Sequence, residues 1–217
     1  DAVSQVAQGL EAAGVGPGVR VAGMLPNAPE AIVAMLATTS LGAIWCACGP
    51  EFGVAAVLDR LRPVAPKVLF AGDGYIYNGQ FLDTLDKARQ VAEALPSVVR
   101  VVVVAHVGDM PEIDSIPGGI GYDDFMDGFA ARDIPFRQFP FNHPVFILYS
   151  SGTTGAPKCI VHGAGGSLLV NLTAQCLHQD VSAGDRLCYW TTTGWVVWNL
   201  MVYGLGRGAT LLLYDGS

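Results

Sequence analysis

Short apolar segments alternate with stretches of helical periodicity through the first half of this sequence, and this alternation restricts the fold more than any other feature. The predicted strands are 19–25, 43–47, 67–71 and 98–105, and the predicted helices are about 3–13, 29–41, 54–62 and 81–95. Strands that are apolar on both faces are typical of a parallel sheet covered by helices on each side. The sequence therefore predicts an α/β fold with a mostly parallel sheet.

A change in composition predicts a division into two α/β lobes. Residues 108–144 are rich in Pro, Gly and Asp, with one short helix expected near 122–130. Strand and helix patterns then resume, and only six charged residues lie in 141–217. We expect a first lobe with its connecting segment over 1–140 and the start of a second, incomplete lobe over 141–217. Within the second part the predicted strands are 145–149, 186–190 and 209–214, and the predicted helices are 163–178 and 196–206.

Composition excludes several classes of protein. Apolar residues make up 51% of the chain and charged residues 14%, which excludes intrinsic disorder. The net charge of −7 argues against nucleic acid as the main partner. Two uncharged stretches, 31–50 and 187–206, contain polar residues and glycine near their centres, so we expect buried α/β elements and no membrane span. The five cysteines show no framework or metal-ligand spacing, which predicts reduced thiols, no metal site and a cytoplasmic location.

One loop carries most of the chemical information. The segment from Ser150 to Lys158 follows an apolar strand and supplies hydroxyls, glycines and a lysine. Backbone N–H groups, hydroxyls and a cation are the donors that hold phosphate oxygens. Its spacing fits neither the P-loop nor the dinucleotide-binding pattern. By composition alone, an ordinary Ser/Thr/Gly turn explains the segment equally well.

The same segment resembles the phosphate loop of the adenylate-forming family, which includes the acyl-CoA synthetases. The family pattern S/T-S-G-S/T-T-G-x-P-K is matched at each fixed position from Ser150 to Lys158. Further stretches, among them 49–54, 158–166 and 192–199, resemble the members that act on acetoacetate. The resemblance covers the whole chain and implies part of a large N-terminal domain.

Members of this family join a carboxylate to ATP and then transfer the acyl group to coenzyme A, with magnesium (Mg2+) as the metal ion. The resemblance implies that the loop holds the β- and γ-phosphates of ATP through Ser150, Ser151, Gly152, Thr153, Thr154, Gly155 and Lys158. It implies that Trp195 and Val196, with Val197 beside them, line the pocket for a short acid. The expected substrates are therefore acetoacetate, ATP and coenzyme A. Two alternatives stay open: a synthetase for acetate or propionate, and a non-catalytic phosphate-binding module.

The resemblance also implies what this chain does not contain. The magnesium-binding acid, the adenine and ribose contacts and the catalytic lysine are expected downstream of Ser217. We therefore expect no catalytic residue within these 217 residues, and a fragment that is inactive without the remainder of its polypeptide. Trp198 is expected in the core, and His162 is expected to be structural more readily than catalytic.

Overall fold

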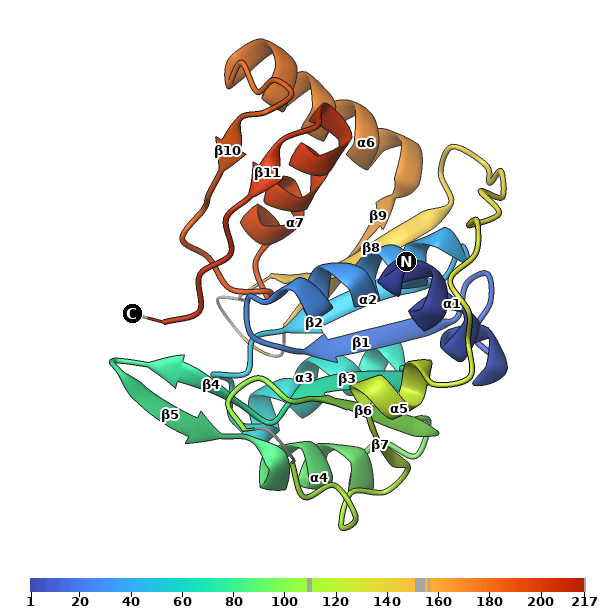
Figure 1. Ribbon diagram of the computed structural model, residues 1–217, viewed down its shortest axis with the longest axis vertical. Coiled ribbons are helices and arrows are strands. Elements are labelled where there is room, and N and C mark those ends of the chain that lie inside the picture. The colour runs from blue at the N-terminus through green and yellow to red at the C-terminus, as the bar shows by residue number, and fades with distance from the viewer. Residues whose placement is uncertain (109–110, 151–154, 156, 217) are drawn as a thin grey trace.

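The computed structural model describes residues 1–108, 111–150, 155 and 157–216, and it is built around one seven-stranded sheet (Figure 1). The strand order is β7-β6-β3-β1-β2-β8-β9, and neighbouring strands are parallel except for β8 and β9. The strands are β1 (Arg20–Met24), β2 (Ile44–Cys48), β3 (Val68–Gly72), β6 (Arg100–Val104), β7 (Gly119–Gly121), β8 (Pro144–Ser150) and β9 (Lys158–Gly163). The mostly parallel α/β fold is thus confirmed.

Helices cover both faces of this sheet and create two hydrophobic cores. The helices are α1 (Ala2–Ala12), α2 (Pro29–Ser40), α3 (Val54–Val64), α4 (Leu85–Glu93) and α5 (Tyr122–Met126). Side chains of α1, α2 and α5 pack on one face against Trp45, Phe70 and Val102. Side chains of α3 and α4 pack on the other face against Cys46, Leu69 and Val101. Because side chains of a strand alternate between faces, each apolar strand supplies both cores.

Helix boundaries follow local sequence signals in most places. Pro29 is the first residue of α2, where its missing N–H group and fixed φ are tolerated. One expected boundary is wrong: Pro63 lies inside the last turn of α3, which ends at Val64.

The predicted helix over 81–95 is also wrong in its first part. Residues 74–83 form a hairpin of β4 (Gly74–Tyr77) and β5 (Gln80–Asp83), and helix α4 begins only at Leu85. Asn78 and Gly79 form the two-residue turn and have φ values of 49° and 70°. Positive φ at both central residues is what a type I′ hairpin turn requires, and Asn-Gly is its preferred pair.

Strands β8 and β9 extend the sheet of the first lobe. The expected strand over 145–149 is confirmed as β8, and it pairs in parallel with β2 through Trp45–Phe146 and Cys46–Ile147. Strand β9 was not predicted, and it returns antiparallel to β8. These strands therefore do not begin a separate sheet, while the division of the chain at residue 140 stays a prediction.

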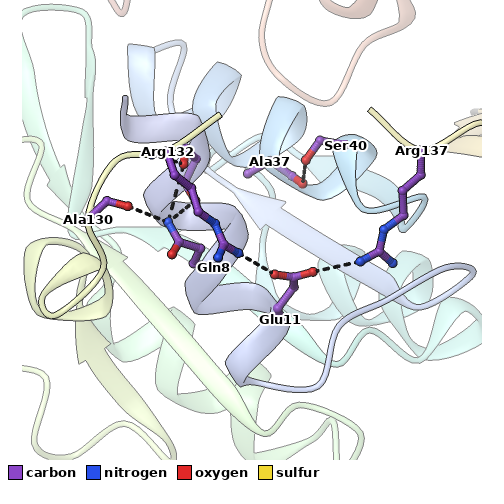
Figure 2. A network of polar contacts seen from close by, with 8 residues as sticks. Gln8, Glu11, Ala37, Ser40, Ala130, Arg132 and Arg137 are labelled. Atoms are coloured by element: carbon purple, nitrogen blue, oxygen red, sulfur yellow. Dashed lines mark hydrogen bonds and ion pairs between the residues drawn. The ribbon is translucent and has the colours of Figure 1, made fainter. Parts of the chain in front are cut away.

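The connecting segment lies along α1 and is held there by polar contacts (Figure 2). Gln8 Nε2 donates to Ala130 O at 2.8 Å, and the backbone N–H of Arg132 donates to Ser4 Oγ at 3.0 Å. Glu11 pairs with Arg132 at 3.4 Å and with Arg137 at 3.3 Å. These contacts hold residues 130–137, which have no regular secondary structure, against α1, and from there the chain continues to β8.

The remaining elements stand beyond the β8–β9 end of the sheet (Figure 1). They are α6 (Ala164–Thr173), a π-helical turn (Ala174–His178), β10 (Arg186–Leu187), α7 (Val196–Val202), a 3₁₀ turn (Tyr203–Arg207) and β11 (Thr210–Leu211). Strands β10 and β11 pair in parallel as a separate two-stranded sheet. Stretch 31–50 forms buried α/β elements as expected, whereas stretch 187–206 is only partly buried, with Trp190 81% and Trp195 57% exposed. None of the described helices has the length and apolar character needed to cross a membrane.

Candidate functional site

The carboxyl ends of the parallel strands bring several loops to one edge of the sheet. Strands β1, β2, β3, β6 and β8 all point the same way, so the residues that follow them lie along this edge. In open α/β sheets, ligands bind outside the carboxyl ends of the strands, near the point where the strand order changes direction. Here the order changes at β1, whose neighbours β2 and β3 lie on opposite sides.

The predicted phosphate loop connects β8 to β9 at this edge. Ser150 ends β8 and Lys158 begins β9, and the two are paired in the antiparallel register. Lys158 and Gly155 are exposed. The other predicted loop residues, Ser151, Gly152, Thr153 and Thr154, lie outside the described residues. The hairpin stem therefore places Ser150 and Lys158 together at the base of the loop.

The segment that precedes α7 is fixed to the same edge by threonine side chains. Thr193 Oγ1 donates to Leu25 O at 2.7 Å, just after β1. Thr192 Oγ1 donates to Glu51 Oε1 at 2.9 Å, just after β2. From the sequence, this Thr-rich run was considered as a possible membrane span and, over 192–199, as part of the family resemblance, and neither interpretation predicted these contacts. Its contacts set the position of α7 relative to the edge.

The three predicted acyl-pocket residues lie at the start of α7. Trp195 is the N-cap residue of α7, and Val196 is the first helical residue. Trp195 is 57% exposed and Val196 is 55% exposed, whereas Val197 is half-buried. Val196 lines a cavity of about 240 Å³ between β8, β9, α6 and α7, which Phe146, Leu148 and His162 also line.

A second cavity, of about 150 Å³, lies at the carboxyl edge, where the β4–β5 hairpin and the last described residues both line it. Glu51, Tyr75, Trp190 and Asp215 are among the residues that line it. Asp215 Oδ2 accepts hydrogen bonds from the backbone N–H of Ile76 at 3.0 Å and contacts His106 Nε2 at 2.9 Å.

His106 follows β6 by two residues and is half-buried. No local signal reveals its contact with a carboxylate 109 positions away.

Burial keeps the aromatic hydroxyl groups near the hairpin stem neutral. Burial raises the pKa of Tyr203, beside the 240 Å³ cavity, to about 12. Burial and the neighbouring thiols of Cys46 and Cys48 raise the pKa of Tyr149, the residue before the loop, far above its usual range. Both phenols therefore act as neutral groups at physiological pH and cannot serve as bases.

Three other side chains, those of Trp198, His143 and His162, have contacts that hold the fold together or line a cavity. Trp198 is fully buried, as expected, and its Nε1 donates to Asn27 Oδ1 at 2.9 Å. His143 stacks on Phe139, and its Nε2 lies 2.8 Å from Gly42 O. His162 is half-buried and lines the 240 Å³ cavity.

All five cysteines are free, and in the described part of the chain no three His, Cys, Asp or Glu side chains converge as metal ligands do.

Comparison with known proteins gives consistent matches over the whole chain. The family model described as AMP-binding enzyme matches residues 1–217. Acetoacetyl-coenzyme A synthetase of Rhizobium meliloti (strain 1021) is 50% identical over 216 residues, which cover 99% of this chain and 33% of that protein. Malonamoyl-CoA synthetase of Penicillium aethiopicum is 43% identical over 221 residues, which cover 99% of this chain and 31% of that protein.

A solved structure also matches the whole chain. Acetoacetyl-CoA synthetase from Streptomyces lividans matches with a TM-score of 0.93 and 43% identity, over 100% of this chain and 32% of that one. The chain therefore spans about a third of the length of the relatives it matches.

Proposed function

Because the chain belongs to the family of AMP-binding enzymes, we propose that it is part of an ATP-dependent ligase that activates acetoacetate and transfers it to coenzyme A. The observation that carries this proposal is the 50% identity, over nearly the whole chain, to an acetoacetyl-coenzyme A synthetase. In the first step a carboxylate oxygen attacks the α-phosphorus of ATP and pyrophosphate leaves. In the second step the thiol of coenzyme A attacks the acyl carbon and AMP leaves.

The loop between β8 and β9 is proposed to hold the phosphates that leave in the first step. Its proposed ligands are Ser150, Ser151, Gly152, Thr153, Thr154, Gly155 and Lys158. Pyrophosphate gains negative charge as it departs, so fixed donors around it stabilise the transition state more than the bound substrate. The position of the hairpin stem at the carboxyl edge supports this role, because ligands of such sheets bind there.

Trp195, Val196 and Val197 are proposed to bound the acyl pocket. The support is that Val196 lines an apolar cavity of short-chain size beside the stem of the loop. Magnesium is proposed to accompany ATP, and its acidic ligand is expected outside this chain, so no step is assigned to the metal here. The free thiols support a reducing, cytoplasmic location.

The test uses the complete gene product and measures pyrophosphate release with ATP, magnesium and a panel of short acids. The panel contains acetoacetate, malonamate, acetate and propionate. We expect release that prefers acetoacetate, and a loss of about a hundredfold or more in Lys158→Ala, because a charged donor to the leaving group is removed. Arg100→Ala serves as the control, because it removes an exposed cation at the amino end of β6, at the opposite edge of the sheet from the loop. Release that is unchanged in Lys158→Ala would contradict the role of the loop.

Malonamate is the second candidate acid, because one relative at 43% identity is a malonamoyl-CoA synthetase. Malonamate has the carbon and oxygen skeleton of acetoacetate with an amino group in place of the methyl group. Release that prefers malonamate would keep the reaction and change the substrate. Preference for acetate or propionate would favour the short-chain alternative, and no release with any acid would favour a phosphate-binding module.

A further inference from the structure

The side chain of Thr193 attaches the segment that leads into α7 to the ends of two neighbouring strands. Thr193 is 1% exposed, and its Oγ1 donates to Leu25 O at 2.7 Å and lies 3.4 Å from Cys48 O. Leu25 directly follows β1, and Cys48 is the last residue of β2. A hydroxyl group has one hydrogen to donate, so the short contact with Leu25 O is the bond that holds the segment.

The residues on either side of Thr193 are held against the loop that follows β2. A Cβ added at Gly194 would lie 2.9 Å from the backbone nitrogen of Gly49 in that loop. Thr192 Oγ1 donates to Glu51 Oε1 in the same loop at 2.9 Å. The backbone at Gly194 therefore approaches the loop too closely for a larger residue, and the segment has one close-fitting position on the strand ends.

The attached segment runs from one cavity to the other. Thr192 lines the cavity of about 150 Å³ at the carboxyl edge, and Val196 lines the cavity of about 240 Å³ between β8, β9, α6 and α7. Trp195 is the N-cap residue of α7, and its backbone N–H donates to Thr192 O at 3.2 Å. A shift of Thr193 would therefore move Trp195 and Val196, because both follow it within one tight turn.

We propose that Thr193 is a positioning residue that holds Trp195 and Val196 in place around the acid that the enzyme activates. This inference rests on the proposed function, which assigns those two side chains to the acyl pocket. Thr193 is buried and lines neither of the two cavities, so it acts through the residues that follow it. Groups that bind a reacting molecule need placement within about 0.5 Å, so an anchor two residues away influences the affinity for the acid.

Replacing Thr193 by valine removes the hydroxyl group and keeps the shape of the side chain. The new methyl group would face Leu25 O, and contacts between carbon and oxygen are about 3.3–3.6 Å long. The segment would therefore move away from β1 by about half an ångström or more, compared with the present 2.7 Å distance. Thr193→Ser keeps the hydroxyl group and is expected to keep the hydrogen bond.

The experiment measures kcat and KM for pyrophosphate release by the complete gene product, with acetoacetate and ATP varied separately. We expect Thr193→Val to raise the KM for acetoacetate by about tenfold, because a misplacement of about 1 Å can cost a hundredfold. The KM for ATP should stay within about twofold, and Thr193→Ser should restore the KM for acetoacetate to within about twofold. A purely structural role would reduce the amount of folded enzyme, which lowers kcat and leaves both KM values unchanged.

Thr84→Val is the matched control for the loss of a buried hydroxyl group. Thr84 is 1% exposed, and its Oγ1 donates to Gly72 O at 2.7 Å, so this change breaks a bond of equal burial and length. Thr84 is the N-cap residue of α4 and does not line the cavity beside Val196. The control is expected to lower the melting temperature and to leave the KM for acetoacetate unchanged.

Two results would overturn the inference: an unchanged KM for acetoacetate in Thr193→Val, and an equal rise in Thr84→Val. No release by the wild type with any acid would refute the proposed function and this inference with it, whereas an unchanged KM would refute only the inference. Where the wild type prefers another acid of the panel, the KM for that acid decides in the same way.

A second variant tests the inference if thermal unfolding shows that Thr193→Val does not fold. Gly194→Ala keeps the Thr193 hydroxyl group and displaces the same segment, because its Cβ would lie 2.9 Å from the backbone nitrogen of Gly49. We expect the same selective rise in the KM for the acid, and an unchanged KM in this variant would also overturn the inference.

Discussion

The hydrogen bond between Trp198 and Asn27 joins α7 to the end of β1, and replacing Trp198 by phenylalanine tests how strongly it holds the helix. Trp198 is 0% exposed and Asn27 is 5% exposed, and the bond from Nε1 to Oδ1 is 2.9 Å long. Trp198→Phe keeps one aromatic ring, deletes the donor and leaves the Asn27 oxygen buried without a partner.

The structure gives an estimate of the cost. A buried acceptor that loses its partner costs about 1–3 kcal/mol. The space left by the smaller ring adds about 1 kcal/mol. We therefore expect Trp198→Phe to lower the local stability of α7 by about 2–4 kcal/mol. The same change at Trp190, which is 81% exposed, should cost less than about 0.5 kcal/mol and is the control.

Native-state hydrogen exchange of the α7 backbone amides in the complete gene product measures this local stability. Asn27→Ala and the double variant complete a double-mutant cycle with Trp198→Phe. Because the double variant has no unpaired acceptor at Asn27, its cost should be about 1–2 kcal/mol smaller than the sum of the single costs. Additive costs, within about 0.5 kcal/mol, would refute the argument that this bond couples α7 to β1.

Three further predictions concern other parts of the fold. Iodoacetamide should modify exposed Cys159 in the native protein and buried Cys46 only after unfolding, which peptide mass spectrometry measures; equal rates would contradict the burial of β2. Burial raises the pKa of Cys46 from 9.0 to about 12, so the neutral thiol contributes stability below pH 9 that is lost as the pH rises toward 12. The melting temperature should therefore fall less steeply between pH 9 and 11 in Cys46→Ala than in the wild type, and parallel slopes would argue against this. Gly42→Ala should cost at least about 1–2 kcal/mol, because φ is +69° and the new Cβ would lie 2.2 Å from the Phe139 ring; Gly16→Ala, with open space around it, is the control in thermal unfolding.

Much of the sheet could be predicted because its central strands are apolar on both faces. This pattern revealed β1, β2, β3 and β6 within one or two residues of their observed ends. The β4–β5 hairpin was missed because Phe81 and Leu82 were assigned to the following helix. The Asn78-Gly79 pair was a usable turn signal, since both residues adopt the positive φ of a tight hairpin.

Part of the candidate site could also be predicted from the sequence, and part could not. The residues of the phosphate loop are contiguous, so a short motif reveals them. The 240 Å³ cavity beside Val196 and the contact between His106 and Asp215 depend on side chains brought together by the fold. Strand β9 was missed although it pairs locally with β8, because its short apolar run, 159–161, lies between the loop motif and the predicted helix over 163–178 and was assigned to neither.

The long-range pairing of β8 with β2 has a consequence for the order in which the strands of the sheet form during folding. The pairing of Trp45 with Phe146 joins positions 101 residues apart in the chain, whereas β1 pairs with β2 across a single helix. Contacts between distant residues require closure of a long loop and so form slowly. During synthesis, the sheet of β1, β2 and β3 can be complete before Phe146 has been made. We therefore expect the β8–β9 hairpin to dock onto a preformed sheet, so that the proposed phosphate site would be completed only in the final stage of folding.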